Sequence, residues 1–182
     1  MSRTKNAESL SRKESIVSAL EDLLKERDLS DITVTDLCAR CNISRQLFYY
    51  HFDNMEALFL WSVKTSTEED TEKVSLVGGI CDVCEAFLSR KILTDAFFSS
   101  EYRDTIIGMI RSDFQMEAEH YVMERIGGSL PENQRRMLIM IIMNGSLGII
   151  TDWIDDGMRI PVSDIHAILT LLVDTVTRIE GP

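Results

Sequence analysis

Apolar residues along this chain recur every three or four positions, and no segment alternates in a sustained way between apolar and polar residues. The first pattern is typical of amphipathic helices, and the second would be needed for half-buried strands. Only three prolines and nine glycines interrupt the 182 residues. We therefore predict an all-α fold, with one helix that begins at residue 11, another that begins at residue 129, and others over residues 34–41, 45–52, 55–73, 80–91, 93–99, 102–125 and 163–179.

Local signals indicate where some of these helices begin or end. Ser11 and Glu14 have the spacing of a capping box, in which each side chain accepts from the backbone N–H of the other residue. Ser129 and Glu132 have the same spacing. The Gly78-Gly79 pair predicts a break before the helix that begins at residue 80.

The segment from residue 32 to residue 52 predicts two short helices joined by a tight turn. In the first helix, Leu37, Cys38 and Cys41 are spaced to share one face. Asn42 follows, and Asn enters the left-handed backbone region more readily than most residues other than glycine. Ser44 then has the position of an N-cap for the second helix. This is the pattern of a helix-turn-helix, which places its second helix in the major groove of DNA.

The second of these helices has two different faces. At about 100° per residue, Phe48 and Phe52 stack on one side, where they are expected to anchor the helix in a core. The other side carries basic, amide and aromatic side chains: Arg45, Gln46, Tyr49 and Tyr50. Such side chains can bond to base edges, and their hydroxyls can reach phosphate. The pattern favours a DNA-reading helix, and packing aromatics are the alternative for the two tyrosines.

Four motifs together carry a family resemblance: Thr33-Val-Thr-Asp-Leu, Asn42-Ile-Ser-Arg, Leu47-Phe-Tyr-Tyr-His-Phe and Asn54-Met-Glu-Ala-Leu. Over about residues 10–60 they resemble the DNA-binding domain of TetR-family transcriptional regulators, and the remaining chain resembles that family in size and helical character. Two positions depart from the family pattern. Asn42 stands where the family usually has glycine, and Met55 stands where it commonly has a lysine that meets a phosphate.

The resemblance implies DNA contacts from the start of the first short helix and along the second: Thr35, Arg45, Gln46, Leu47, Tyr49, Tyr50 and His51. For His51, a structural hydrogen bond to the backbone is the alternative. The resemblance also implies a ligand-responsive repressor, in which an effector in the helical body changes the spacing of two heads and lowers operator affinity. We accordingly expect a helix-turn-helix domain at residues 1–53 and an effector-binding and dimerisation domain at residues 54–182.

The charge of the chain is distributed unevenly. The formal net charge is −11, which taken alone argues against a nucleic-acid partner. Residues 1–52, however, hold eight basic and eight acidic residues, so the whole excess of negative charge lies in residues 53–182. Four of the first thirteen residues are basic and one is acidic. They predict an arm that lies along the phosphate backbone, with a solvated, disordered tail as the alternative.

The C-terminal third predicts a dimer interface. Residues 137–143 are apolar all round, and a helix with no polar face must be covered on both sides. Small residues at Gly145, Ser146 and Gly148 would let another helix approach closely. We therefore expect a two-fold homodimer through the last two helices of each subunit, with the core of a monomer as the alternative. A dimer would present two reading helices about 34 Å apart, so the DNA operator should be an inverted repeat.

The effector of the body is unknown from sequence. Apolar or adaptable residues in the middle of the body are candidates for lining a small-molecule site: Cys84, Phe87, Met109, Phe114, Met116 and Trp153. No metal or cofactor is predicted. The pairs Cys38/Cys41 and Cys81/Cys84 resemble halves of a zinc site, but their spacing of three within helices favours a core position. Thiol sensing by the second pair is the alternative.

The sequence also limits location and class. No run approaches the roughly 18 uninterrupted apolar residues of a membrane helix, and the N-terminus is polar, so we expect a cytoplasmic protein without a membrane partner. No phosphate-binding glycine loop, nucleophile elbow or Ser-His-Asp set is evident, so we expect no enzyme. Two rival interpretations stay open: a regulator or activator whose body binds a partner protein, and a helical enzyme or scaffold that does not bind DNA.

Overall fold

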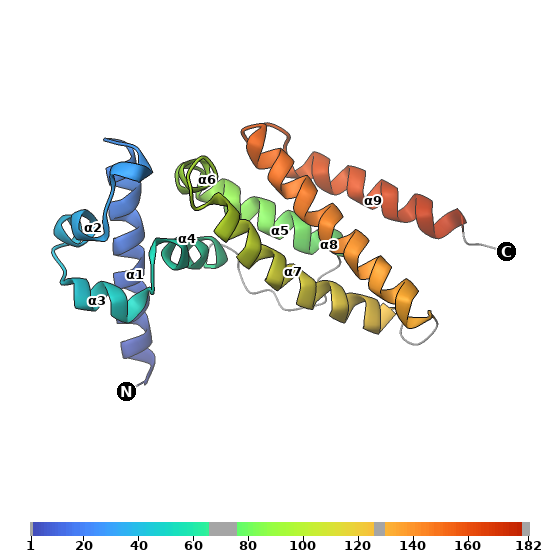
Figure 1. The fold of residues 1–182 in the computed structure, drawn as a ribbon, viewed down its shortest axis with the longest axis horizontal. Coiled ribbons are helices and arrows are strands. Elements are labelled where there is room, and N and C mark those ends of the chain that lie inside the picture. The colour runs from blue at the N-terminus through green and yellow to red at the C-terminus, as the bar shows by residue number, and fades with distance from the viewer. Residues whose placement is uncertain (1, 66–75, 126–129, 180–182) are drawn as a thin grey trace. The chain divides into compact units, whose positions relative to one another are not determined.

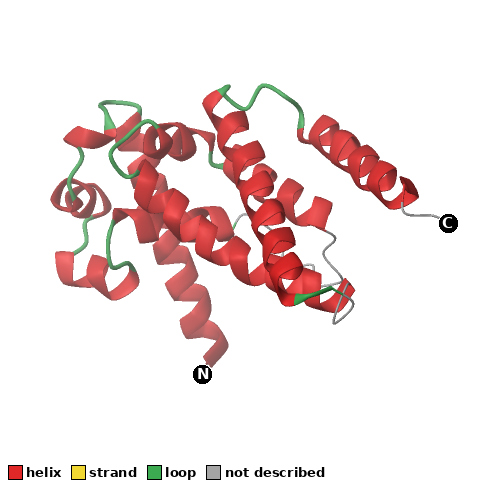
Figure 2. Ribbon diagram, turned by 45° about the vertical axis from the view of Figure 1, so that its right-hand side comes forward, coloured by secondary structure: helices red, strands yellow, loops and turns green. Residues whose placement is uncertain are grey.

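The computed structural model describes residues 2–65, 76–125 and 130–179, and every regular element in these ranges is a helix (Figure 2). This confirms the predicted all-α fold. The elements, labelled in Figure 1, are α1 Ser2–Leu24, the 3-10 turn η1 Leu29–Asp31, α2 Val34–Cys41, α3 Arg45–His51, α4 Met55–Lys64, α5 Leu76–Ser89, α6 Lys91–Phe98, α7 Arg103–Arg125, α8 Glu132–Asp155 and α9 Val162–Ile179.

The chain forms two compact units. The first contains residues 1–66 and 89–103, and the second contains residues 67–88 and 104–182. The head predicted at residues 1–53 lies wholly within the first unit. That unit also includes α4 and, from much later in the chain, α6.

Helix α6 is held in the first unit by stacking and by charge. The rings of Phe59 on α4 and Phe97 on α6 stack with centroids 4.6 Å apart. The Arg90 guanidinium, at the N-cap of α6, lies 2.8 Å from the carboxylate of Glu14 and 3.7 Å from that of Glu21, both on α1. Phe59 and Phe97 have no exposed surface. The support of the first unit therefore comes partly from a helix that follows α5.

Two predicted signals for helix ends are wrong. Helix α1 begins at Ser2, so Ser11 is not a cap; its carbonyl accepts from the Ser15 hydroxyl at 2.9 Å inside the helix. The basic residues near the N-terminus therefore belong to a helix instead of an extended arm. Helix α5 runs through Gly78-Gly79 without a break. Each glycine costs a helix about 1 kcal/mol relative to alanine, and burial of the neighbouring Val77 and Ile80 offsets that cost.

Other predicted bounds differ or cannot be compared. Helix α4 ends at Lys64, with Thr65 as its C-cap, whereas the spacing predicted a helix to residue 73; residues 66–73 lie outside the described residues. Helix α8 begins at Glu132 with Pro131 at the N-cap and no side-chain cap. The proposed cap residue Ser129 and the Gly127-Gly128 pair lie outside the described residues.

The second unit contains α7, α8, α9 and most of α5. Ile106, Ile150 and Trp153 are buried in it, and the Trp153 indole N–H donates to the Ile160 carbonyl at 2.8 Å. This bond closes the turn between α8 and α9, where Met158 has a φ of 59°. In the described residues, α8 is also the one helix long and apolar enough to cross a membrane by composition, a test that core helices of soluble proteins pass too.

Candidate nucleic-acid interface

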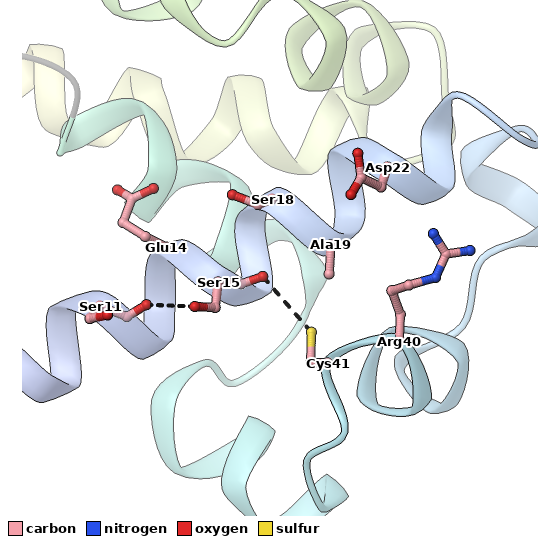
Figure 3. A pocket seen from close by; sticks show the side chains of 8 residues that line it. All are labelled: Ser11, Glu14, Ser15, Ser18, Ala19, Asp22, Arg40 and Cys41. Atoms are coloured by element: carbon pink, nitrogen blue, oxygen red, sulfur yellow. Dashed lines mark hydrogen bonds between the residues drawn. The ribbon is translucent and has the colours of Figure 1, made fainter.

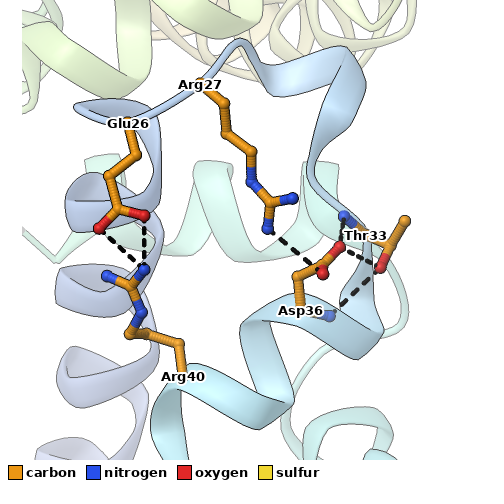
Figure 4. A network of polar contacts seen from close by, with 5 residues as sticks. All are labelled: Glu26, Arg27, Thr33, Asp36 and Arg40. Atoms are coloured by element: carbon orange, nitrogen blue, oxygen red, sulfur yellow. Dashed lines mark hydrogen bonds and ion pairs between the residues drawn. The ribbon is translucent and has the colours of Figure 1, made fainter.

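The start of α2 is fixed by a reciprocal cap. The Thr33 hydroxyl accepts from the Asp36 backbone N–H at 3.2 Å, and the Asp36 carboxylate accepts from the Thr33 N–H at 2.9 Å. The Arg27 guanidinium lies 3.3 Å from the same carboxylate (Figure 4). The hydrogen bonds from Thr33, with a smaller contribution from Arg27, lower the pKa of Asp36 to about 2. Asp36 therefore stays ionised in this cap at neutral pH.

A second ion pair joins α1 to α2 beyond that cap. One terminal nitrogen of Arg40 lies 2.7 Å and 2.9 Å from the two carboxylate oxygens of Glu26 (Figure 4). The hydrogen bond from Arg40 lowers the pKa of Glu26. Both partners are partly exposed, so the pair contributes modestly to stability. It does engage the charge of Arg40, which is then less available to a nucleic acid.

The turn between α2 and α3 is the one that the sequence predicts. Asn42 has φ 52° and ψ 47°, in the left-handed region, and its N–H donates to the carbonyls of Ala39 and Cys38. The Ser44 hydroxyl accepts from the Leu47 N–H at 3.1 Å and caps α3. These contacts let two short helices meet at a sharp angle without a glycine. The helix-turn-helix prediction is confirmed in this local geometry.

Helix α3 is anchored on one side and exposed on the other. Phe48 and Phe52 are buried, with ring centroids 5.9 Å apart, and Phe52 also meets Trp61 of α4 edge-on at 5.6 Å. Tyr49 is 47% exposed and Tyr50 is 80% exposed. Of the other residues predicted to contact DNA, Thr35, Arg45 and Gln46 are exposed, whereas Leu47 and His51 are half-buried. The structure thus brings five of the seven together as exposed side chains on α2 and α3.

Arg45 is the cation of this exposed surface. In the same unit, the basic side chains of Lys25, Arg27 and Arg40 are each within 4 Å of a carboxylate. No ion pair joins Arg45 to any residue in the described ranges. Its guanidinium carbon instead lies 6.0 Å from the centroid of the Tyr49 ring. The guanidinium therefore keeps its donors for another partner.

A second group of cations lies at the other end of α3. The Lys13 ammonium on α1 is 5.3 Å from the Phe52 ring and 5.1 Å from the Trp61 ring. His51 lies nearby, and burial, followed by Lys13 and Arg12, lowers its pKa. The Nε2 atom of His51 is buried and has no hydrogen-bond partner among the described residues, so the backbone bond considered for His51 is not found at that atom.

Sequence reasoning missed the placement of Arg12 and Lys13 beside the reading helix. It assigned them to an arm, whereas both lie within α1, where Arg12 is exposed and Lys13 is half-buried. A usable signal was present, because Lys13 lies one helical turn before the buried Ile16 and Val17. A lysine stem at that spacing can follow the apolar face and keep its ammonium in solvent.

A hollow of about 550 Å³ lies elsewhere on the first unit, between α1 and the end of α2 (Figure 3). The Cys41 thiol reaches the Ser15 carbonyl across it, at 4.0 Å. Its lining mixes hydroxyls, carboxylates and one guanidinium: Ser11, Glu14, Ser15, Ser18, Ala19, Asp22, Arg40 and Cys41. None of the six predicted effector residues lines this hollow.

The predicted effector residues divide into two groups in the second unit. Four of them are buried: Cys84, Phe87, Phe114 and Trp153. Met109 and Met116, by contrast, are 39% and 66% exposed. The structure therefore does not bring all six to one buried lining, and their role as an effector site stays a prediction.

The cysteines are in environments that disfavour the thiolate. Burial raises the pKa of Cys84 to about 12 and also raises the pKa of Cys38, Cys41 and Cys81. Three of these thiols are buried, and Cys41 is half-buried. Because the thiolate is both the nucleophile and the metal ligand, these sites favour packing over thiol chemistry. Among the described residues, no cluster of three or more metal-ligating side chains occurs.

Comparison with known families agrees with this geometry. A family model described as bacterial regulatory proteins, tetR family, matches residues 16–60. A second model, described as a transcriptional regulator C-terminal region, matches residues 76–175 and so covers more than half of the 182 residues. The chain belongs to the TetR family of transcriptional regulators. As a TetR-family protein it is a DNA-binding transcriptional regulator, which points away from the rival interpretation as a helical enzyme or scaffold.

Two curated relatives are similar to this TetR-family regulator. The probable acrEF/envCD operon repressor of Escherichia coli K12 is 22% identical over 206 aligned positions, which cover 100% of this chain and 92% of the repressor. The HTH-type transcriptional regulator EthR of Mycobacterium tuberculosis H37Rv is 43% identical over 49 residues, which cover 27% of this chain and 23% of EthR.

Proposed function

We propose that this regulator is a homodimeric, cytoplasmic repressor that binds an inverted-repeat operator with α3 of each subunit. An effector in the second unit would reduce its affinity for the operator. The observation that carries the proposal is the exposed surface of α3, where Arg45 and Tyr49 are held over the buried Phe48 and Phe52.

The geometry of α3 supports contact with both bases and phosphates. A helix-turn-helix inserts the N-terminal part of its second helix toward base edges, and in this chain that part holds Arg45 and Gln46. Arg12 and Lys13, near the other end of α3, supply positive charge suited to a phosphate strand. Tyr50 has a hydroxyl and a mostly exposed ring that suit either role.

Exposed apolar surface supports the homodimer. In the most apolar part of α8 only 28% of the residues are buried within one chain. Up to residue 171, the large exposed apolar side chains of α8 and α9 are Met137, Met140, Ile141, Ile149, Ile168 and Leu171. Several large exposed apolar side chains on two helices are typical of a protein interface.

Two glycines of α8 give independent support. A Cβ built on Gly145 or Gly148 would meet no atom within 4 Å, so packing inside the chain does not require glycine at either position. Each glycine costs the helix about 1 kcal/mol relative to alanine. A helix of a second subunit that approaches closely at these positions would account for the cost.

Repression is supported by a relative, and the effector response by the buried side chains of the second unit. The printed name of the Escherichia coli relative describes a repressor, and its similarity covers the whole of this chain. In the second unit, Cys84, Phe87, Phe114 and Trp153 are buried apolar side chains of the kind that line small-molecule sites. A bound effector is expected to raise the melting temperature because it binds the folded state alone. It is expected to lower operator affinity because it prefers the conformation that does not fit the operator.

The operator proposal is tested by selecting genomic fragments with the full-length protein and measuring affinity by electrophoretic mobility shift. The double variant Arg45→Ala, Tyr49→Ala should lose binding while keeping its circular dichroism spectrum. Arg159→Ala is the matched control, because Arg159 is a highly exposed arginine that pairs with Asp156 outside α3. Wild-type protein that binds no genomic fragment at low salt would refute the proposal.

The dimer proposal is tested by sedimentation of variants that place a charge on an exposed apolar site. Ile141→Asp on α8 should yield monomers and weaken operator binding, because an uncompensated carboxylate would be buried in the interface. Met123→Asp on α7 is the control, since Met123 is 53% exposed and Ile141 63%, but Met123 lies on another helix and has no assigned role. A wild-type protein that sediments as a monomer at micromolar concentration would exclude the dimer.

A further inference from the structure

We infer that Arg45 reads a guanine in each operator half-site and that Tyr49 positions its guanidinium for that contact. The inference rests on the operator binding proposed above and goes beyond it by assigning a base to a residue. It follows from the position of Arg45 at the start of α3, from its contact with the Tyr49 ring, and from the base whose acceptors match the arginine's donors.

Arg45 has the position from which recognition helices reach base edges. It is the first residue of α3, directly after the Ser44 cap, and its side chain is exposed. The N-terminal residues of a recognition helix contact the bases in the major groove, whereas later residues approach the backbone. Arg12 and Lys13, the cations near the far end of α3, are therefore suited to phosphates, and Arg45 is suited to a base.

The contact with Tyr49 holds the guanidinium of Arg45. Tyr49 follows Arg45 by four residues, so the two side chains lie on the same face of α3. The guanidinium carbon lies 6.0 Å from the ring centroid, within the range of a cation–π contact. Tyr49 is itself packed edge-on against the buried Phe48, with centroids 5.4 Å apart. The arginine therefore rests on a ring that is supported by the core.

The charge environment leaves the guanidinium available. Arg27 and Arg40 bind carboxylates, whereas Arg45 has no ion pair with the described residues. Its five N–H donors form a planar fork, and it offers no acceptor. A base that it recognises must therefore present two acceptors side by side.

Guanine is the base that meets this requirement. In the major groove, guanine presents the acceptors N7 and O6, whereas adenine presents one acceptor beside an amino donor. The neighbouring Gln46 carries an amide with both a donor and an acceptor, which matches adenine instead. The two adjacent residues thus predict different bases, and this difference makes the assignment testable.

The test is a selection from random duplexes with the full-length protein at one fixed salt concentration, followed by sequencing. Wild type should enrich half-sites with a guanine at one defined position. Arg45→Ala should reduce discrimination at that position about 5- to 150-fold, the range of a lost bidentate contact. Other positions should keep their preference. Arg45→Lys should restore little of it, because a lysine is a point charge without the fork.

Variants at Tyr49 separate positioning from direct contact. Tyr49→Phe keeps the ring and should retain the guanine preference. Tyr49→Ala should weaken that preference about two- to fivefold, the range for loss of one exposed cation–π contact. Arg12→Ala is the matched control: it should lower affinity for all sequences alike and reduce the salt dependence by about one counterion.

The possible results distinguish the inference from the proposed function. If wild type enriches no duplex, operator binding itself fails. If wild type selects a motif and Arg45→Ala keeps every base preference of that motif, operator binding stands and the guanine assignment is overturned. Loss of preference at a position that is not guanine would overturn the assignment as well.

Discussion

Replacing Phe97 by alanine should destabilise the helix-turn-helix unit, although Phe97 lies on α6, far beyond α3 in the sequence. Its ring has no exposed surface and stacks on Phe59 of α4 with a centroid distance of 4.6 Å. The Phe97 ring also meets that of Tyr102 at 5.6 Å. Removal of the Phe97 ring would leave a cavity against the helix that follows the recognition helix.

The expected loss is large compared with the stability of a small unit. Truncation of a buried phenylalanine to alanine costs about 3–5 kcal/mol, and the aromatic pair contributes about 0.5–1.5 kcal/mol of that. Domains are stable by about 5–15 kcal/mol in total. With a urea dependence of about 1–3 kcal/mol per molar for small proteins, Phe97→Ala should lower the unfolding midpoint by at least about 1 M.

The chain offers a reporter for each unit, because it has two tryptophans. Trp61 lies on α4 in the first unit, and Trp153 lies on α8 in the second. In a Trp153→Phe background, the fluorescence of Trp61 follows the first unit alone. The proteins with Phe97 and with Phe97→Ala both carry Trp153→Phe, so the free energy lost with the Trp153 indole cancels in the comparison.

Two further variants make the measurement decisive. Ile92→Ala changes an α6 side chain that is 45% exposed and should alter stability by less than about 0.5 kcal/mol. Phe97→Leu keeps most of the volume and should fall between wild type and Phe97→Ala. An equal, small shift for Phe97→Ala and Ile92→Ala would show that α6 does not support the head, and the reasoning would be refuted.

Three other predictions follow from local geometry. Hydrogen bonds from Thr33 lower the pKa of Asp36 to about 2 from its usual 3.8. The stabilisation from Asp36 is therefore complete above about pH 4 and declines as the pH falls toward 2. An NMR titration of the Asp36 carboxyl measures this pKa, and a midpoint near 3.8 would contradict the prediction. Burial raises the pKa of Cys84 to about 12, so in the native protein Cys84 should react with iodoacetamide much more slowly than the half-buried Cys41. Mass spectrometry measures both rates of alkylation, and equal rates would contradict this prediction. Asn42→Ala should lower the free energy of unfolding by about 1 kcal/mol, because φ is positive at this residue, whereas Asn42→Gly should be nearly neutral. Thermal unfolding measures both variants, and equal effects would argue against strain at this turn.

The helix-turn-helix could be predicted because its signals act over three or four residues. The left-handed Asn42 and the Ser44 cap each depend on their immediate neighbours, and both occur as expected. The exposed face of α3 also followed from periodicity, once Phe48 and Phe52 were assigned to the core. Local chemistry therefore determined most of the candidate DNA surface.

Local signals failed at two predicted helix boundaries. Ser11 has the spacing of a cap but lies inside a helix that begins at Ser2. The Gly78-Gly79 pair lies inside α5, since Val77 and Ile80 on either side are buried. A capping pattern or a glycine pair therefore shows where a helix can end, and not that it does end there.

The support of the reading head could not be predicted for a related reason. It depends on the pairing of Arg90 with Glu14 and Glu21, residues far apart in the chain, and no spacing rule connects them. Helix α5 ends at Ser89 and α6 begins at Lys91, so Arg90 is the single residue between them. The residue that links the two helices covalently is thus the one that binds α1 of the head. An ion pair between residues 76 positions apart leaves no periodic or local signal in the sequence, so only the folded structure shows that Arg90 helps to hold α6 against α1.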